Sequence, residues 1–426
     1  MLRACAAGRL SGLFCLLPRL SELQMRIALV NSYFYPDEPG GAERSVRILA
    51  EALGEAGHQV LVVALSDLGA NEVAPPQHHS LGVEVARLRI QNARLPARTG
   101  SVSALGKLIW HTKDTYNRAA ARAVVRVLAE FHPDVIHTNN LAGFSVAIWG
   151  HAADLGIPVV HTLRDFYLAC PKTTMASDAG HPCERQCNSC RMFSVPRASA
   201  TKHVNAVVGI SHFMLKKHRE LGMFGASSEH VIYNSYDGVS YAPRCASSLT
   251  LGFLGRVVPE KGVQLLLDAF KGSDIEIAGG QLLVAGEGGA DYIEALKRSA
   301  GSTRVSFIGR QNPPDFFKQI DICVVPSIWN EPLGRVALES LVHGRPVVVT
   351  PVGGLPELAQ SRAGVVAQGL DVHALRSAMN EMSVRLMGDP DGISLAAEAE
   401  RGRFLPDVVA KAYLSVYDSV ARARLE

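Results

Sequence analysis

Short β-branched runs alternate with longer amphipathic stretches along most of this chain, and the whole pattern occurs twice. In the first half we expect strands at 26–31, 59–64, 134–138, 158–162 and 206–210. In the second half we expect strands at 249–254, 281–285, 304–308, 321–325 and 346–350. Apolar residues at helical spacing predict helices at 42–56, 261–271, 290–300, 313–319 and 334–343. Strands that alternate with helices form parallel sheets, so the chain is predicted to be an α/β protein with two Rossmann-like domains.

The length of 426 residues also exceeds what one hydrophobic core usually supports. We expect a first domain over 25–243 and a second over 244–403, while the amphipathic segment 404–424 could pack on either. Ligands of open α/β sheets lie beyond the carboxyl ends of the strands, which predicts a ligand cleft between the two domains. Residues 1–24 make a poor signal peptide, and we interpret them as a mis-annotated or disordered extension before a true start at Met25.

Charge and composition limit the choice of partners. The net charge of +3 is too small for a general nucleic-acid binder, and no run of eighteen apolar residues suggests a membrane span. The stretch 85–128 nevertheless carries nine basic residues against one acid, Asp114. It is either a solvated helix face or a surface for an anionic partner such as lipid headgroups or a diphosphate-linked acceptor.

Two windows in the second half carry groups suited to a nucleotide. The first places Glu331 in a loop before a helix that begins near Leu333 or Gly334, where unpaired amides can bind an anion. Glu339 lies inside this helix, where a carboxylate needs hydrogen-bond donors, and vicinal ribose hydroxyls would supply two.

The second window places Arg256 and Lys261 after a predicted strand. Their two positive charges suit a diphosphate without a metal ion. The alternative is surface pairing with Glu260 and Asp268.

Several motifs in order resemble the retaining glycosyltransferases of family 4, which have the GT-B fold. They are a glycine-rich turn at 39–44, the segment 255–262, the Glu331/Glu339 pair and the helical Pro356-Glu357 after 352–354. The resemblance covers nearly all of 25–424. It implies that Arg256 and Lys261 hold the donor diphosphate, that Glu339 binds the ribose and that Glu331 faces the transferred sugar. It also implies that the amides of Leu333 and Gly334 cap the phosphates, and that Gly40 and Gly41 approach the sugar or the diphosphate.

In the first half, the resemblance makes His161 a candidate for contact with the acceptor or the sugar, with Arg164 or Asp165 sharing that role. The alternative is a core histidine bonded to a carbonyl group. Asn234 and Asp237 resemble a family turn at the domain junction, although Ser235 stands where glycine is usual. The resemblance also implies front-face attack without a metal cofactor. Because the donor phosphate takes the acceptor proton in that mechanism, we assign no general base.

Four cysteines, Cys170, Cys183, Cys187 and Cys190, lie within 21 residues in the spacing C-x12-C-x3-C-x2-C. This arrangement predicts a structural zinc site with four thiolate ligands and no open position. An iron–sulfur cluster, two disulfides and four free thiols are the alternatives, and His181 could replace one cysteine.

Together these features predict a cytoplasmic, metal-independent retaining glycosyltransferase that acts on a glycan or lipid-diphosphate-linked acceptor in surface polysaccharide or glycoconjugate synthesis. The basic stretch favours attachment to the inner face of the cytoplasmic membrane. The alternatives are a GT-B nucleotide-sugar epimerase and a sugar-nucleotide-binding protein without turnover. A nicotinamide dehydrogenase is disfavoured, because the turn after the first strand lacks G-x-G-x-x-G.

Overall fold

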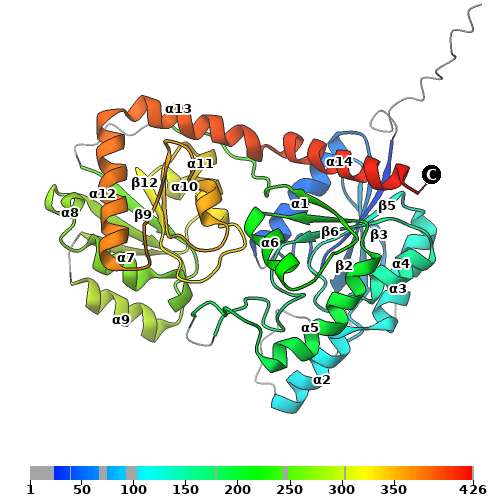
Figure 1. Cartoon of the computed structure of the whole chain (residues 1–426). Helices are drawn as coiled ribbons and strands as arrows, with labels where there is room; N and C mark the ends of the chain where they lie inside the picture. The colour runs from blue at the N-terminus through cyan, green and yellow to red at the C-terminus, as the bar shows by residue number, and fades with distance from the viewer. Residues whose placement is uncertain are drawn as a thin grey trace, which may run out of the picture.

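The computed structural model describes residues 24–38, 40–66, 74–92, 103–177, 180–242, 248–301 and 304–424. Residues 1–23 of the expected extension lie outside these ranges. The expected domain boundary at 243 does as well. Two sheets form two lobes that lie side by side in Figure 1. The two-lobed α/β architecture predicted from the alternating pattern is therefore present.

The first lobe contains an eight-stranded sheet in the order β3-β4-β2-β1-β5-β6-β7-β8. Neighbouring strands are parallel except for the antiparallel pair β3 and β4. The strands are β1 (Arg26–Val30), β2 (Gln59–Ser66), β3 (Ala74–Ser80), β4 (Val83–Arg89), β5 (Val135–Thr138), β6 (Val159–Leu163), β7 (Ala206–Gly209) and β8 (Ser228–Val231). Sequence reasoning found five of these and missed β3, β4 and β8.

Helices cover the faces of this sheet (Figure 1). They are α1 (Gly41–Glu55), α2 (Ala104–Thr115), α3 (Arg118–Phe131), α4 (Ala147–Asp154), α5 (Asn188–Ala200), η2 (Thr201–His203) and α6 (His212–Glu220). The predicted helix at 42–56 corresponds to α1. The basic stretch 85–128 contributes the end of β4, α2 and most of α3, while Arg94 and Arg98 lie outside the described residues.

The second lobe contains a six-stranded parallel sheet in the order β11-β10-β9-β12-β13-β14. Its strands are β9 (Thr250–Leu254), β10 (Gln281–Ala285), β11 (Val305–Gly309), β12 (Ile322–Val325), β13 (Val347–Val349) and β14 (Gly364–Val366). Its helical segments are η3 (Pro259–Lys261), α7 (Val263–Phe270), α8 (Asp274–Ile277), α9 (Ala290–Ala300), α10 (Pro313–Phe317), α11 (Arg335–Val342), η4 (Leu355–Leu358) and α12 (Val372–Gly388). Pro356 and Glu357 thus lie in a single 3-10 turn.

The chain then returns to the first lobe. Helix α13 (Pro390–Arg401) packs on α11 and α12, η5 (Gly402–Phe404) follows, and α14 (Pro406–Arg422) packs on α1, β5 and β6 (Figure 1). The apolar side of α14 joins the core of the first sheet, where the hydroxyl of Tyr417 lies 2.6 Å from Nδ1 of His137. Of the two domains on which the C-terminal segment could pack, it therefore crosses back to the first. No helix in the described part of the chain is long and apolar enough to cross a bilayer.

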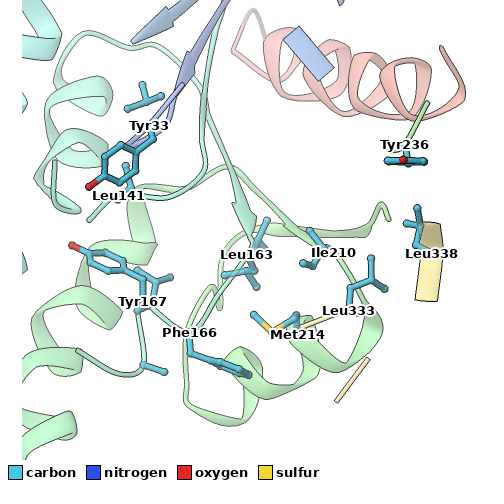
Figure 2. Packing of buried hydrophobic residues seen from close by; sticks show 14 of the residues in the cluster. Tyr33, Leu141, Leu163, Phe166, Tyr167, Ile210, Met214, Tyr236, Leu333 and Leu338 are labelled. Atoms are coloured by element: carbon cyan, nitrogen blue, oxygen red, sulfur yellow. The ribbon is translucent and has the colours of Figure 1, made fainter. Parts of the chain in front are cut away.

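One apolar cluster continues from the first lobe into the second. Figure 2 shows Leu333 of the second lobe next to Met214 of α6, with Leu338 of α11 and Tyr236 close by. All four side chains are buried. Burial of apolar area is the main driving force of association, so this cluster holds the two lobes together.

Candidate functional site

Two neighbouring cavities lie where the strands of the two sheets end. The first has a volume of about 720 Å³ and is lined from both lobes by residues that include Gly40, Gly41, Arg44, Gly255, Arg335 and Glu339. The second has a volume of about 660 Å³ and is lined by Gly40, Gly41, Glu43, Asp165 and Tyr167 of the first lobe and by Arg256 of the second. Because Gly40 and Gly41 line both, the start of α1 separates two halves of one crevice.

Glu339 lies in the second turn of α11, and its side chain is 5% exposed. Its Oε1 accepts a hydrogen bond of 2.7 Å from Nε of Arg335, one turn earlier in the same helix. Burial raises the pKa of Glu339, and the Arg335 guanidinium opposes that shift. Arg335 thus supplies one of the hydrogen-bond donors that this buried carboxylate was expected to need. Sequence reasoning did not single out Arg335.

Arg335 also joins the lobes. Its Nη1 donates to the carbonyl oxygen of Gly41 at 3.0 Å and to the hydroxyl of Ser45 at 2.7 Å. A Cβ on Gly41 would lie 2.6 Å from Cδ of Arg335, so only glycine allows this approach. The i,i+4 spacing of Arg335 and Glu339 was the available signal, but the same spacing is typical of ordinary helix surface pairs.

Lys261 and Glu331 are paired with each other in this structure. Nζ of Lys261 lies 2.5 Å from Oε1 of Glu331, which also accepts a hydrogen bond of 2.7 Å from the hydroxyl of Ser327. The Lys261 ammonium lies over the ring of Trp329. Neither residue belongs to the lining of the two cavities above. The structure therefore pairs Lys261, predicted to bind the diphosphate, with Glu331, predicted to face the sugar.

A left-handed glycine sets the position of Lys261. Gly262 has φ 69°, and a Cβ there would lie 1.9 Å from the carbonyl oxygen of Pro326. The η3 turn that carries Lys261 is thereby pressed against the loop after β12, where Glu331 lies.

Arg256 extends from the second lobe into the 660 Å³ cavity. Its side chain is 71% exposed, and its Nη2 lies 3.9 Å from Oε1 of Glu260. A pair so open to water contributes little to stability and leaves the guanidinium available to a ligand.

The start of α11 contains the other predicted phosphate contacts. Gly334 is the N-cap of α11 with φ 94°, and a Cβ there would clash with Leu355. The side chain of Leu333 is buried in the cluster between the lobes. The predicted amides are thus at a helix N-terminus, where backbone N–H groups lack intrahelical partners.

Glu357 forms a second link between the lobes. Its carboxylate accepts hydrogen bonds of 2.9 Å from the backbone N–H groups of His212 and Phe213, at the start of α6. The hydroxyl of Tyr233 donates to it as well, at 3.1 Å. A carboxylate at a helix N-terminus is favourable, so the second lobe caps a helix of the first.

Three candidate residues at the end of β6 lie in different environments. His161 lies within the strand, 3% exposed, where Nδ1 is 2.9 Å from the Thr138 hydroxyl. Its ring stacks on Phe224, and burial lowers its pKa to about 3, so it is held neutral. It does not line either cavity. This is the core environment given above as the alternative, with a hydroxyl in place of the carbonyl.

Arg164 and Asp165 directly follow the strand, and of the two only Asp165 lines one of the cavities described above. Arg164 is buried and donates 2.7 Å hydrogen bonds to the side-chain oxygens of Asn139 and Asn234. The bond to Asn234 links the end of β6 to the connection between the two lobes. Asp165 lines the 660 Å³ cavity, and burial raises its pKa to about 6.

The four cysteines are free thiols, of which Cys170, Cys183 and Cys187 lie between β6 and α5 and Cys190 lies in the first turn of α5. Sγ of Cys190 lies 3.7 Å from Sγ of Cys170, whereas Cys183 is half-buried and Cys187 is exposed at the N-cap of α5. Among the residues described by the structure, no group of three or more His, Cys, Asp or Glu side chains is already arranged to hold a metal ion.

Comparisons with known proteins agree with this architecture. A family model described as "Glycosyl transferases group 1" matches residues 248–383, and one described as "Glycosyl transferase 4-like domain" matches residues 40–235. A Klebsiella pneumoniae protein described as "Uncharacterized 42.6 kDa protein in cps region" is 32% identical over 92% of this chain and 100% of its own length. A Mycobacterium tuberculosis glycogen synthase is 26% identical over 93% of this chain and 95% of its own.

Solved structures show the same fold. Anabaena HepE, in complex with UDP and glucose, has a TM-score of 0.65 at 20% identity, covering 93% of this chain and 100% of its own. Sucrose-phosphate synthase from Thermosynechococcus elongatus has a TM-score of 0.69 at 22% identity, covering 94% and 100%. The two facing α/β lobes of this chain are thus the GT-B fold.

Proposed function

Because this chain belongs to the group 1 glycosyltransferases, we propose that it transfers a sugar from a nucleotide-sugar donor to a glycan or lipid-diphosphate-linked acceptor with retention of the anomeric configuration. The observation that carries the proposal is the divided crevice, in which two cavities meet at Gly40 and Gly41. Transfer requires the acceptor oxygen to reach the anomeric carbon of the donor sugar. Two cavities that share one wall allow that contact.

In this proposal the nucleotide lies in the 720 Å³ cavity with its ribose hydroxyls on the carboxylate of Glu339. The diphosphate reaches the amides at the start of α11, the guanidinium of Arg256 and the ammonium of Lys261. These groups stabilise the negative charge that develops on the leaving nucleoside diphosphate. They supply this stabilisation without a metal ion in the chemistry.

The transferred sugar lies next to Gly40 and Gly41 and faces Glu331. The acceptor occupies the 660 Å³ cavity, where Asp165 and Tyr167 form part of the wall. The acceptor oxygen forms its bond to the anomeric carbon on the face from which the diphosphate departs, and the hydroxyl proton passes to a phosphate oxygen of the leaving group. Lys261, paired with Glu331 in this structure, would turn from that carboxylate to the diphosphate when the donor binds.

The Klebsiella relative, described by its place in a cps region, supports an acceptor from surface polysaccharide synthesis. The basic α2–α3 region supports attachment to the cytoplasmic face of an anionic membrane, because Lys107, Lys113, Arg118 and Arg122 are exposed there. Sedimentation with anionic vesicles at low salt should then be lost at high salt. Sedimentation that is absent at low salt, or equal at both, would contradict this placement.

A thermal-shift panel of nucleotide sugars tests the proposal, because a bound donor raises the melting temperature according to its affinity. The stabilising donor is then incubated with lipid-linked acceptors, and release of the nucleoside diphosphate together with a glycosylated product is measured. Release of nucleotide with an epimerised free sugar would indicate an epimerase. A thermal shift without turnover on any acceptor would indicate a binding protein.

A further inference from the structure

The segment between β6 and α5 is buried as far as Cys170, but beyond that residue it has little core of its own. From residue 164 to 187 it contains no helix or strand among the described residues, apart from an isolated bridge between Ala176 and Pro182. Between residues 171 and 192, Met175 is the one described apolar side chain that is buried. An irregular stretch of this length with so little buried apolar area is uncommon in a compact domain and calls for some other constraint.

This segment nevertheless forms part of the crevice. Pro171, Lys172 and Thr173, directly after Cys170, line the 660 Å³ cavity. Farther along, Gly180 reaches the second lobe, where a Cβ would lie 3.2 Å from Cβ of Glu260. Glu260 stands between Arg256 and Lys261 in sequence, so the segment spans from the acceptor cavity to the proposed diphosphate ligands.

Backbone hydrogen bonds fold the segment back on itself and bring the thiols together. The N–H of Cys183 donates to the carbonyl oxygen of Met175 at 2.8 Å. Cys190 then approaches Cys170 from the first turn of α5, with 3.7 Å between the sulfurs. This separation is too long for a disulfide. A tetrahedron of sulfurs about 2.3 Å from a central zinc has edges of about 3.8 Å, which the observed distance matches.

We propose that Cys170, Cys183, Cys187 and Cys190 bind one Zn²⁺ ion that fixes this segment against the crevice. The Cys170–Cys190 pair supplies one edge of the tetrahedron. Cys187, one helical turn before Cys190, and Cys183 complete it by rotating about χ1, which moves a sulfur by about 3 Å. Both are more exposed than Cys170, so the rotation is not blocked by core packing. On binding, each thiol releases its proton to solvent.

The chemistry of the set favours a structural zinc ion. Four thiolates are soft ligands that select zinc over magnesium or calcium, and a fourth protein ligand leaves no position for substrate. Zinc would therefore act on the shape of the acceptor cavity and take no part in the transfer step. This inference stands apart from the proposed function, because it concerns metal content and loop order.

The test is metal analysis of the full chain, produced in zinc-supplemented medium and purified under reducing conditions without a chelator. We expect about one zinc per chain in the wild type. Cys187→Ser and Cys190→Ser should each reduce bound zinc at least about tenfold, because a ligand is lost. Cys245→Ser removes a cysteine outside the segment and should keep the full zinc content. Limited proteolysis between 171 and 187 should accelerate when the wild type is treated with chelator.

Several results would overturn the proposal. Zinc near zero in the wild type, or zinc unchanged in Cys187→Ser, would show that these thiols do not hold it. Iron with sulfide in place of zinc would identify a cluster. Disulfides found by mass after alkylation of the unreduced protein would assign the sulfurs to covalent pairs. Cys187 is exposed, so its serine variant should fold, and an unchanged melting temperature of the chelated form would establish that the loss of zinc is local.

Discussion

Glu339→Gln is the substitution that most directly tests the donor site. It keeps the shape of the side chain in α11 and removes its charge. In the wild type, one carboxylate oxygen is occupied by Arg335 and the carboxylate lines the 720 Å³ cavity. A glutamine retains one oxygen that can accept a hydrogen bond, but the NH2 group that replaces the other oxygen cannot accept one from a ribose hydroxyl.

The size of the effect follows from the type of hydrogen bond. Bonds to a charged group contribute about 1.5–3 kcal/mol, against about 0.5–1.5 kcal/mol for neutral pairs. Replacing charged by neutral contacts to the ribose should therefore weaken nucleotide binding by about 2 kcal/mol, which corresponds to roughly thirtyfold in Kd. Burial strengthens this expectation, because water cannot replace the lost acceptor.

The assay is isothermal titration of UDP, GDP and ADP, with the tightest binder used for the comparison. Glu294→Gln is the matched control, because Glu294 forms an exposed pair with Lys297 on α9, away from the crevice. Its Kd should equal that of the wild type. A Glu339→Gln protein with an unchanged melting temperature and a Kd within about threefold of the wild type would refute the ribose assignment.

Three further predictions concern other parts of the crevice. Arg256→Ala and Lys261→Ala should each lower kcat about tenfold or more, because each removes a positive charge that stabilises the negative leaving diphosphate. Wild-type rates in both would show that these side chains point elsewhere. Glu357→Gln should reduce the free energy of unfolding by about 1–2 kcal/mol in urea titrations, because α6 loses its charged cap, and unchanged stability would remove that role. The pKa of Asp165, raised by burial to about 6, makes its contribution to stability complete below about pH 4 and lost as the pH rises through 6. Asp165→Asn should thus be more stable than the wild type at pH 7, by about 1–3 kcal/mol, with the difference shrinking toward pH 4.5 in the same titrations; a difference that does not change with pH would contradict it.

The regular parts of the fold could be predicted because their apolar residues recur at clear periods. Strand β10 has the predicted bounds of 281–285, and α9 those of 290–300. Strand β3 could not be predicted, because its sequence, with two prolines and two histidines, lacks apolar alternation. The destination of α14 was open as well, since an amphipathic helix does not specify which sheet it covers.

The site shows a similar division. Glu339 was predicted from local chemistry, and Gly40 and Gly41 from the family resemblance; all three line one cavity. The role of Arg335 depends on the approach of Gly41 from a different lobe, a contact between residues far apart in sequence that local patterns do not encode. His161 shows another limit of sequence reasoning. A buried residue inside a strand and a residue at its ligand-facing end cannot be told apart until the end of the strand is known. That end is Leu163, two residues later.

The position of α14 has a consequence for how the polypeptide is made. The ribosome delivers β1 to β8 early, but side chains that close one face of their sheet, among them Tyr413 and Tyr417, are added only after the whole second lobe. The second lobe from β9 to α12 is contiguous and can mature while the first still waits for its final layer. Synthesis from the N-terminus therefore does not set the order of folding here, and the half-covered sheet is the species that a chaperone would have to protect.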